Sequence, residues 1–284
     1  MNWLLVDELI KGALKEDIYY EDITTNSIVG HCSQSTVDLI SKEDGIIAGT
    51  EIFTRVFTLL GSANTELYVN DGDKIYKGQK LGEIYGNTRA ILTGERVALN
   101  FLQRMSGIAT LTDKFVRKLE GTTTKLLDTR KTTPGMRVFE KYAVKVGGGC
   151  NHRFGLNDGV LIKDNHIDAA GGIKNAIELL KKNASFVRKI EVEVENLSQL
   201  EEALEAKADI IMLDNMDIET LKTAVKIVNR KATTEASGNV TLDSIDEIAK
   251  TGVDYISTGV LTHSFKVLDL SIKNLRMLKN NINL

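Results

Sequence analysis

The segment from Asp128 to His166 reads DTRKTTPGMRVFEKYAVKVGGGCNHRFGLNDGVLIKDNH. Two short β-rich runs, at Lys125–Asp128 and Gly159–Lys163, lie on either side of a helical pattern at Met136–Val146. A strand, a helix and a second strand in succession form the unit from which parallel α/β sheets are built. The segment therefore predicts a parallel α/β fold for the second half of the chain.

The same alternation continues to the end of that half. Further strands are expected at Lys189–Glu193, Asp209–Asp214, Lys231–Glu235 and Asp254–Thr258. Helices are expected between them at Ala170–Lys182, Leu197–Ala206, Ile218–Val228 and Leu242–Lys250. A dinucleotide-binding sheet would carry GxGxxG after its first strand, and this motif is absent from the sequence. We therefore predict an incomplete (β/α) barrel.

Polar or charged residues stand at the carboxyl end of every expected strand. They read Asp128-Thr-Arg130, Lys163-Asp-Asn-His166, Glu193, Asp214-Asn215, Glu235-Ala-Ser237-Gly238 and Ser257-Thr-Gly259. In barrels the functional groups sit at the carboxyl ends of the strands, so these segments are expected to meet at one mouth. The pattern predicts a functional site there.

The charge of the Asp128–His166 segment is opposite to that of the whole chain. The chain has 36 Lys+Arg against 39 Asp+Glu, a net charge of -3. Within the segment the cations outnumber the acids, and glycines and two histidines lie among them. The cations are Arg130, Lys131, Arg137, Lys141, Lys145, Arg153 and Lys163. This composition favours a site for a small, multiply charged anion.

Length and composition exclude several other classes of protein. A chain of 284 residues that is 42% hydrophobic and 26% charged is typical of a globular protein with one large or two modest domains. An isoelectric point near 5.9 argues against nucleic-acid binding and against an anionic membrane surface. Cys32 and Cys150 form no metal-binding or disulfide pattern. The expectation is a cytoplasmic protein with reduced thiols.

The first hundred residues have a different pattern, with a helix at Asn2–Lys15 followed by short strands and turns. A long helix is expected from Thr93 to about Leu119, with Gly107 as a point where it could break or kink. Arg96 would lie in its first turn, where the helix dipole disfavours a cation. From the residues alone, a surface salt bridge with Glu95 is the simplest interpretation of Arg96.

The expected mouth contains groups with distinct chemistry. Glu193 and Asp214 end consecutive strands, and two carboxylates facing a polyphosphate commonly hold Mg²⁺. Lys163 could bind an anion or act as a Schiff-base nucleophile. Small residues at Ser237-Gly238-Asn239 and at Ser257-Thr-Gly259 suit a phosphate cradle.

These motifs together resemble the quinolinate phosphoribosyltransferase family over nearly the full length. The resemblance is carried by TGERVALN (Thr93–Asn100), SGIAT (Ser106–Thr110), DTRKTTPG (Asp128–Gly135), GGGCNHR (Gly147–Arg153), LIKDNHI (Leu161–Ile167), EVEVEN (Glu191–Asn196), IIMLDN (Ile210–Asn215), EASGNV (Glu235–Val240) and ISTGVLTHS (Ile256–Ser264). It implies the transfer of phosphoribosyl from phosphoribosyl pyrophosphate to quinolinate, giving nicotinate mononucleotide, pyrophosphate and CO₂, with Mg²⁺.

The resemblance also implies an architecture. An N-terminal α+β sandwich domain, residues 1–110 completed by 265–284, would pack on a barrel domain of residues 111–264. The active sites would be shared between the subunits of a homodimer.

Site roles follow from the same resemblance. Arg130, His152, Arg153 and Lys163 would hold the quinolinate carboxylates, joined by Arg96 of a partner subunit, which replaces the salt-bridge interpretation. Lys131 would lie near the phosphoribosyl donor, and Glu193 and Asp214 would face the ribose and bind the metal. Lys131, Lys163, Glu193 and Asp214 are the expected catalytic residues. The phosphate would be bound by Ser237, Gly238, Asn239, Ser257, Gly259 and His263.

Three alternatives remain open. The first is a related phosphoribosyltransferase with another acceptor, as suggested for molybdenum-associated homologues. The second is a barrel that binds a phosphoribosyl ligand as a sensor without catalysis, and the third is a Schiff-base lyase using Lys163. The acid pair of Glu193 and Asp214 argues against the sensor, because a pure binder has little need of it.

Overall fold

A computed structural model describes residues 1–278, and the last part of the segment expected to complete the first domain, 279–284, lies outside the described residues. The chain divides into two compact units. Unit 1 contains Met1–Leu111, Pro134–Gly147 and the chain from Phe265 onward, while unit 2 contains Thr112–Thr133 and Gly148–Ser264. Within residues 1–278, no helix combines the length and apolar character needed to cross a bilayer.

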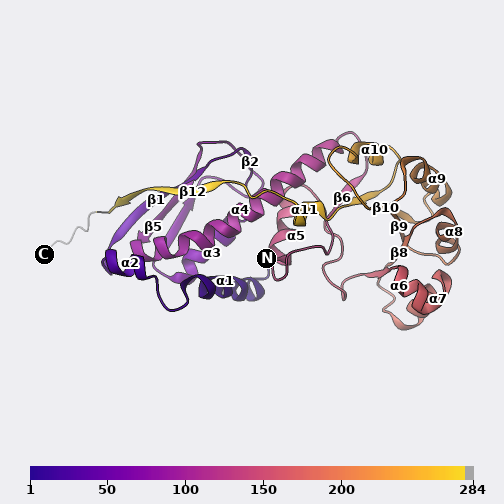
Figure 1. Ribbon diagram of the computed structural model, residues 1–284, viewed down its shortest axis with the longest axis horizontal. Helices are drawn as coiled ribbons and strands as arrows, with labels where there is room; N and C mark the ends of the chain where they lie inside the picture. Colours follow the sequence, from indigo (N-terminus) through magenta and orange to yellow (C-terminus); the bar gives the residue numbers. More distant parts are fainter. Residues whose placement is uncertain (279–284) are drawn as a thin grey trace. The chain divides into compact units, whose positions relative to one another are not determined.

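Unit 1 is an α+β domain built on an antiparallel sheet, as predicted. The sheet has the order β12-β1-β5-β3, and β2 and β4 form a separate pair. The strands are β1 (Gln34–Ser41), β2 (Gly45–Ile46), β3 (Ala63–Leu67), β4 (Lys74–Ile75), β5 (Lys80–Asn87) and β12 (Leu270–Met277). The last strand pairs with β1 although more than two hundred residues separate them in the sequence (Figure 1).

The helices of unit 1 have apolar faces that form its core. They are α1 (Trp3–Ile18), α2 (Ile23–Ile28), α3 (Thr50–Leu60), the first part of α4 (Thr88–Lys118), and α5 (Arg137–Val146). In α3 the spacing of Ile52, Phe53, Val56 and Phe57 puts all four in the core. A Cβ on Gly94 of α4 would lie about 3 Å from Phe57, so a glycine permits this close helix packing.

Helix α4 differs from its prediction in two respects. It begins at Thr88, so Arg96 lies beyond the first turn, and its side chain is exposed. It also continues through Gly107 without interruption. A Cβ on Gly107 would lie 2.3 Å from the carbonyl oxygen of Lys266, so this glycine serves a close backbone approach rather than a kink.

Helix α5 belongs to unit 1, although the sequence places it between two barrel strands. The buried Glu140 accepts a hydrogen bond from Nε of Arg104 at 3.0 Å, and the Phe139 and Phe101 rings lie 4.8 Å apart. Tyr142 donates to Asp71 at 2.8 Å. These three contacts tie α5 to α4 and to the loop before β4.

Unit 2 is an open parallel sheet flanked by helices, which confirms the incomplete (β/α) barrel. Its order is β6-β11-β10-β9-β8-β7. The strands are β6 (Lys125–Leu127), β7 (Val160–Ile162), β8 (Ile190–Val194), β9 (Ile210–Asp214), β10 (Thr233–Ser237) and β11 (Tyr255–Ser257). All six were predicted. β6 and β7 are consecutive in the chain but form the two edges, so the barrel is open between them.

The glycine-rich segment partly covers the β6 edge. Cys150 donates its N–H to Leu126 O at 2.8 Å, and Asp128 donates to Cys150 O at 3.1 Å. Cys150 thus forms an isolated parallel bridge with Leu127 of the edge strand β6. This places His152 and Arg153 directly after a strand-like segment inside unit 2.

Helices α7 (Ile173–Asn183), α8 (Leu197–Glu205) and α9 (Ile218–Val228) lie on the outer side of the sheet (Figure 1). The other helices of unit 2 are α6 (Asp164–Ala170), α10 (Ile245–Ala249) and α11 (Val260–His263). The single helix expected at Ala170–Lys182 is wrong at its start, because Gly171 and Gly172, with φ of 77° and 129°, separate α6 from α7. The helix expected at Leu242–Lys250 is shorter at both ends.

The importance of the long-range pairing between β1 and β12 can be tested by substituting Asp38 of β1. Its carboxylate accepts from Arg276 at 2.8 and 2.9 Å, from Asn274 and from Lys80, and its side chain is 8% exposed. The hydrogen bonds from Arg276 hold the pKa of Asp38 well below its usual range. We expect Asp38→Ala to lower the free energy of unfolding at pH 7 by about 2 kcal/mol, as measured by urea denaturation.

The difference between the wild type and this variant should depend on pH. In the unfolded chain the pKa of Asp38 is about 4, and in the folded protein it is lower. The ionised carboxylate therefore stabilises the fold fully at pH values above the unfolded pKa, and this stabilisation is lost as the pH falls through the folded pKa. Glu247→Ala, which removes an exposed partner of Lys250, is the control and should leave unfolding unchanged. If Asp38→Ala and Glu247→Ala changed the free energy of unfolding equally at pH 7, the proposed contribution of Asp38 to the pairing of β1 and β12 would be contradicted.

Candidate active site

The carboxyl ends of the six barrel strands meet at a cavity of about 480 Å³ in unit 2. Its lining combines four cations, two carboxylates and several small polar residues. The lining residues are Thr129, Arg130, Lys131, His152, Arg153, Leu161, Lys163, Glu193, Met212, Asp214, Asn215, Ser237, Gly238, Asn239 and Ser257. The structure thus brings together most of the residues that the sequence singled out, while their individual roles stay predictions.

Three of the residues singled out do not line this cavity. Arg96 lies in unit 1, exposed on α4. Gly259 precedes α11 and is buried, and His263 is exposed at the end of α11 with Nδ1 2.7 Å from Ser264 Oγ. Gly259 still approaches the site, because a Cβ on it would lie 2.9 Å from Cδ of Lys131 and 2.9 Å from the His263 ring.

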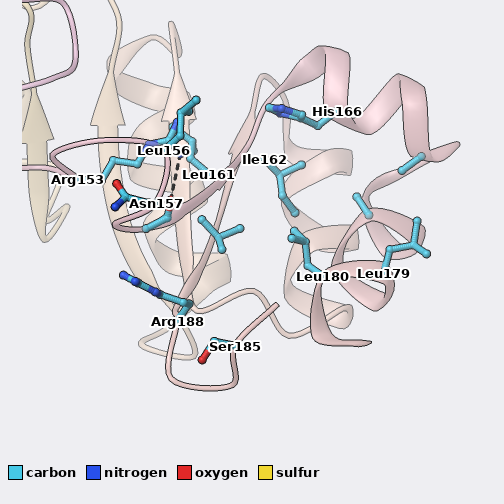
Figure 2. Close-up of a pocket in the computed structure, with 14 residues that line it drawn as sticks. Arg153, Leu156, Asn157, Leu161, Ile162, His166, Leu179, Leu180, Ser185 and Arg188 are labelled. Carbon is cyan, nitrogen blue, oxygen red and sulfur yellow. Dashed lines mark hydrogen bonds between the residues drawn. The ribbon is translucent and has the colours of Figure 1, made fainter. Parts of the chain in front are cut away.

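A second cavity of unit 2, about 510 Å³, has a different character. Figure 2 shows it between the edge strand β7 and α7, with Leu161, Ile162, Leu179 and Leu180 on its walls. Arg153 and Leu161 border both cavities. The second cavity contains none of the strand-end carboxylates, so the 480 Å³ cavity is the candidate active site.

Two cations of the site are close to each other. Arg153 Nη1 donates to Gly159 O at 3.0 Å, which fixes its guanidinium next to β7. Burial lowers the pKa of Arg153, and the nearby positive charge of Arg130 lowers it further. Like charges at short range are unfavourable unless an anion lies between them. The pair therefore favours binding of a carboxylate or phosphate.

Lys163 follows β7 and forms an ion pair with Glu193, which ends the neighbouring strand β8. Its backbone N–H donates to Nδ1 of His166 at 3.0 Å, so that histidine caps α6 and does not face the cavity. The Lys163 side chain is 45% exposed. An ion-paired ammonium open to solvent is suited to binding an anion, and it does not favour the Schiff-base alternative.

The loops after β9 and β10 are joined by hydrogen bonds. Asn239 Nδ2 donates to Asn215 Oδ1 at 3.1 Å, and Asn215 Nδ2 donates to Asp214 at 2.6 Å. Gly238, with φ of 96°, lies against Asn215. These loops carry backbone groups and small side chains at the mouth, as a phosphate cradle requires. The next helix, α10, begins only at Ile245, so its N-terminus does not directly follow this loop.

Below the cavity lies a buried cluster of His152, Glu191 and Glu235. The sequence pattern placed His152 and Glu235 at the mouth and did not single out Glu191. Glu191 of β8 and Glu235 of β10 are 4% and 2% exposed. His152 Nε2 lies 3.1 Å from Glu191 Oε2 and 3.6 Å from Glu235 Oε2. Alternation along β8 could have revealed Glu191, because a strand that directs Glu193 inward also directs Glu191 inward.

His152 itself is held from several sides. Its backbone N–H donates to the fully buried Asp128 at 2.8 Å, and its Nδ1 accepts the N–H of Arg153 at 2.7 Å. The ring borders the cavity, but both of its nitrogens have protein atoms nearby. The predicted contact between His152 and a substrate carboxylate stays a prediction.

An open parallel barrel with a cation-rich cavity at its strand ends defines a barrel protein built to bind small polyanions. Comparisons with known proteins give the family. The family model for the quinolinate phosphoribosyl transferase C-terminal domain matches residues 108–273, and the model for the N-terminal domain matches residues 22–106. The chain belongs to the quinolinate phosphoribosyltransferase family.

Individual relatives agree over nearly the whole chain. The chain is 46% identical to the probable nicotinate-nucleotide pyrophosphorylase (carboxylating) of Bacillus subtilis, with 96% of this chain and 94% of that protein covered. Among solved structures, NadC from Streptococcus pyogenes has a TM-score of 0.95 at 46% identity, covering 98% and 99% of the two chains. The nicotinate-nucleotide pyrophosphorylase from Francisella tularensis has a TM-score of 0.92 at 43% identity, covering 97% and 98%.

Gly238 gives a test of the cradle geometry. A Cβ there would lie 2.2 Å from Asn215 Oδ1, whereas a Cβ on Gly121, which has a similar φ of 84°, would meet no atom within 4 Å. We expect Gly121→Ala to cost about 1 kcal/mol of unfolding free energy through backbone strain alone. Gly238→Ala should cost clearly more and should weaken binding of phosphoribosyl pyrophosphate, which carries the 5′-phosphate, measured by calorimetry. If Gly238→Ala and Gly121→Ala lost the same unfolding free energy and binding were unchanged, the close contact between Gly238 and Asn215 would be contradicted.

Proposed function

We propose that this protein transfers the phosphoribosyl group of phosphoribosyl pyrophosphate to the ring nitrogen of quinolinate and releases pyrophosphate and CO₂, giving nicotinate mononucleotide for NAD biosynthesis. Membership of the family supports this reaction, since relatives at 42 to 46% identity are named for it. The single observation that carries the proposal is the cavity itself, where four cations and two carboxylates from separate strands meet.

Quinolinate is a dianion, and its carboxylates would be bound by the adjacent guanidinium groups of Arg130 and Arg153 and by Lys163. In the structure Lys163 is paired with Glu193. An acceptor carboxylate would compete for that ammonium and leave Glu193 to face the ribose. The cations thus orient the ring nitrogen toward the sugar, and such positioning lowers the barrier of a bimolecular step.

The transferring ribose carbon acquires positive charge as the bond to pyrophosphate breaks. Glu193 and Asp214 line the same cavity and would stabilise that charge, while Lys131 would stabilise the leaving pyrophosphate. Thr262 Oγ1 donates to Lys131 O at 2.8 Å and holds that residue beside Gly259. Ser237, Gly238, Asn239 and Ser257, with Gly259 and His263 nearby, would receive the 5′-phosphate.

Ribosylation makes the ring nitrogen cationic, and loss of CO₂ leaves an electron pair on the adjacent ring carbon. That pair is stabilised by the neighbouring positive nitrogen before the carbon takes up a proton. Arg130 and Arg153 would add further positive charge near the departing carboxylate. The residues required for transfer therefore also suit decarboxylation.

Mg²⁺ fits the strand-end carboxylates. Glu193 and Asp214 offer oxygen ligands on neighbouring strands, and Mg²⁺ commonly takes one or two carboxylates and completes its shell with water and substrate oxygens. When bound, the ion would neutralise negative charge on the pyrophosphate.

The proposal extends to the assembly and the cellular compartment. We propose a homodimer in which Arg96 of one subunit contributes to the site of the other, supported by the exposure of this arginine in a motif that the family resemblance carries. A cytoplasmic location is supported by Cys32 and Cys150, which are free thiols.

The reaction can be tested directly with purified protein. We expect release of pyrophosphate and CO₂ from quinolinate only when phosphoribosyl pyrophosphate and Mg²⁺ are both present, because acceptor, donor and metal share one cavity. Coupled pyrophosphate detection and trapping of labelled CO₂ measure the two products. Turnover of nicotinate but not quinolinate would contradict the proposal, and binding without turnover would favour the sensor.

Shared sites can be tested by mixing two inactive variants, Arg96→Ala and Lys163→Ala. If Arg96 serves the partner's site, each mixed dimer regains one intact site, so equal mixing should restore about a quarter of wild-type activity. Each variant mixed with itself is the control. Absence of recovery, with subunit exchange proven by pull-down of differently tagged chains, would refute the shared site.

A further inference from the structure

Asn215 lines the active-site cavity and lies between the two groups of residues that would bind the phosphoribosyl donor. It follows Asp214, which would face the ribose and the metal. Its backbone N–H donates to Ser237 O at 2.9 Å, one residue beyond the last aligned pair of β9 and β10. The loop of Ser237, Gly238 and Asn239 would receive the 5′-phosphate. Asn215 is therefore placed to act on both groups at once.

The side-chain amide of Asn215 joins these two groups. Its Nδ2 donates to Asp214 Oδ2 at 2.6 Å, and its Oδ1 accepts from Asn239 Nδ2 at 3.1 Å. Both distances are suited to hydrogen bonds. One amide thus uses its donor on the carboxylate and its acceptor on the phosphate loop. An aliphatic side chain has no polar atom for either contact, and an ionised carboxylate has acceptors alone.

The backbone around Asn215 is shaped for this contact. Asn215 has a φ of 53°, in the left-handed region, which asparagine adopts more readily than most residues other than glycine. A Cβ on Gly238 would lie 2.2 Å from Asn215 Oδ1 and 2.9 Å from its backbone nitrogen. The amide therefore occupies the space that a side chain at position 238 would fill.

We propose that Asn215 is a positioning residue for the donor: its amide holds the Asp214 carboxylate and the 237–239 loop as one unit, so that the two ends of the donor are bound together. The proposal rests on the proposed function for the identity of the donor. Groups that are already ordered bind a ligand more tightly, because less freedom is lost when the ligand arrives. Without the amide, each end of the donor would have to order its own group of residues.

The first measurement is calorimetric binding of phosphoribosyl pyrophosphate in the presence of Mg²⁺. Asn215→Gly removes the amide and leaves a residue that adopts a positive φ without strain. We expect donor binding about tenfold weaker, a loss typical for hydrogen bonds to a charged group, while quinolinate affinity and the free energy of unfolding change little. Asn229→Gly is the matched control and should change neither affinity, because Asn229 also has a positive φ, of 44°, but lines a different cavity at the end of α9.

The second measurement adds Asn239→Gly, which removes the other end of the hydrogen-bonded chain, again at a residue of positive φ. If the two asparagines act through each other, their effects are not additive. The double variant should then bind the donor about as weakly as the weaker-binding single variant. Two independent tenfold losses would instead multiply to about a hundredfold.

The possible failures are distinguishable. Unchanged donor binding in Asn215→Gly, or losses that multiply in the double variant, would overturn the positioning role and leave the proposed function intact. Losses of quinolinate affinity as large as the loss of donor affinity would overturn it in favour of a general structural role. A wild type that binds no phosphoribosyl pyrophosphate would overturn the proposed function and the role of Asn215 together.

Discussion

Repulsion among clustered cations is the constraint on which the site depends. Arg130, Lys131, Arg153 and Lys163 line one cavity, and burial together with the neighbouring guanidinium of Arg130 lowers the pKa of Arg153. A protein can keep such a cluster only by supplying internal counter-charges. Here they come from Glu193, which pairs with Lys163, and from Glu191, whose charge favours the charged form of Arg153. The substrate then replaces these counter-charges.

Strand alternation places the counter-charges at two depths. Along β8, Glu191 and Glu193 point to the same side two residues apart, one buried below the cavity and one at its mouth. Along β10, Glu235 and Ser237 have the same relation. The parallel sheet thus builds a layer of solvent-accessible groups for the ligand and, beneath it, a buried layer that holds the first in place.

This two-layer construction explains how much could be predicted from the sequence. Polar residues after short apolar strands mark the upper layer plainly, so the residue pattern alone was enough to place Lys163, Glu193, Asp214 and Ser237 at one mouth. Glu191 stands inside a strand, where a charged residue is usually taken to face solvent, although its alternation with Glu193 could have revealed it. Glu235 was expected to end its strand at the mouth, but β10 continues to Ser237 and Glu235 is buried below the mouth. The depth of both side chains depends on tertiary structure.

Two other differences between the predicted and the observed structure can be traced to particular residues. Two consecutive glycines with positive φ precede α7, which therefore begins at Ile173 instead of the predicted Ala170, and the short helix α6 before them was not predicted. Helix α5 groups with unit 1 because of side-chain contacts of Glu140, Phe139 and Tyr142 with residues far away in the sequence. Periodicity detects neither effect, since one depends on backbone conformation at single residues and the other on long-range partners.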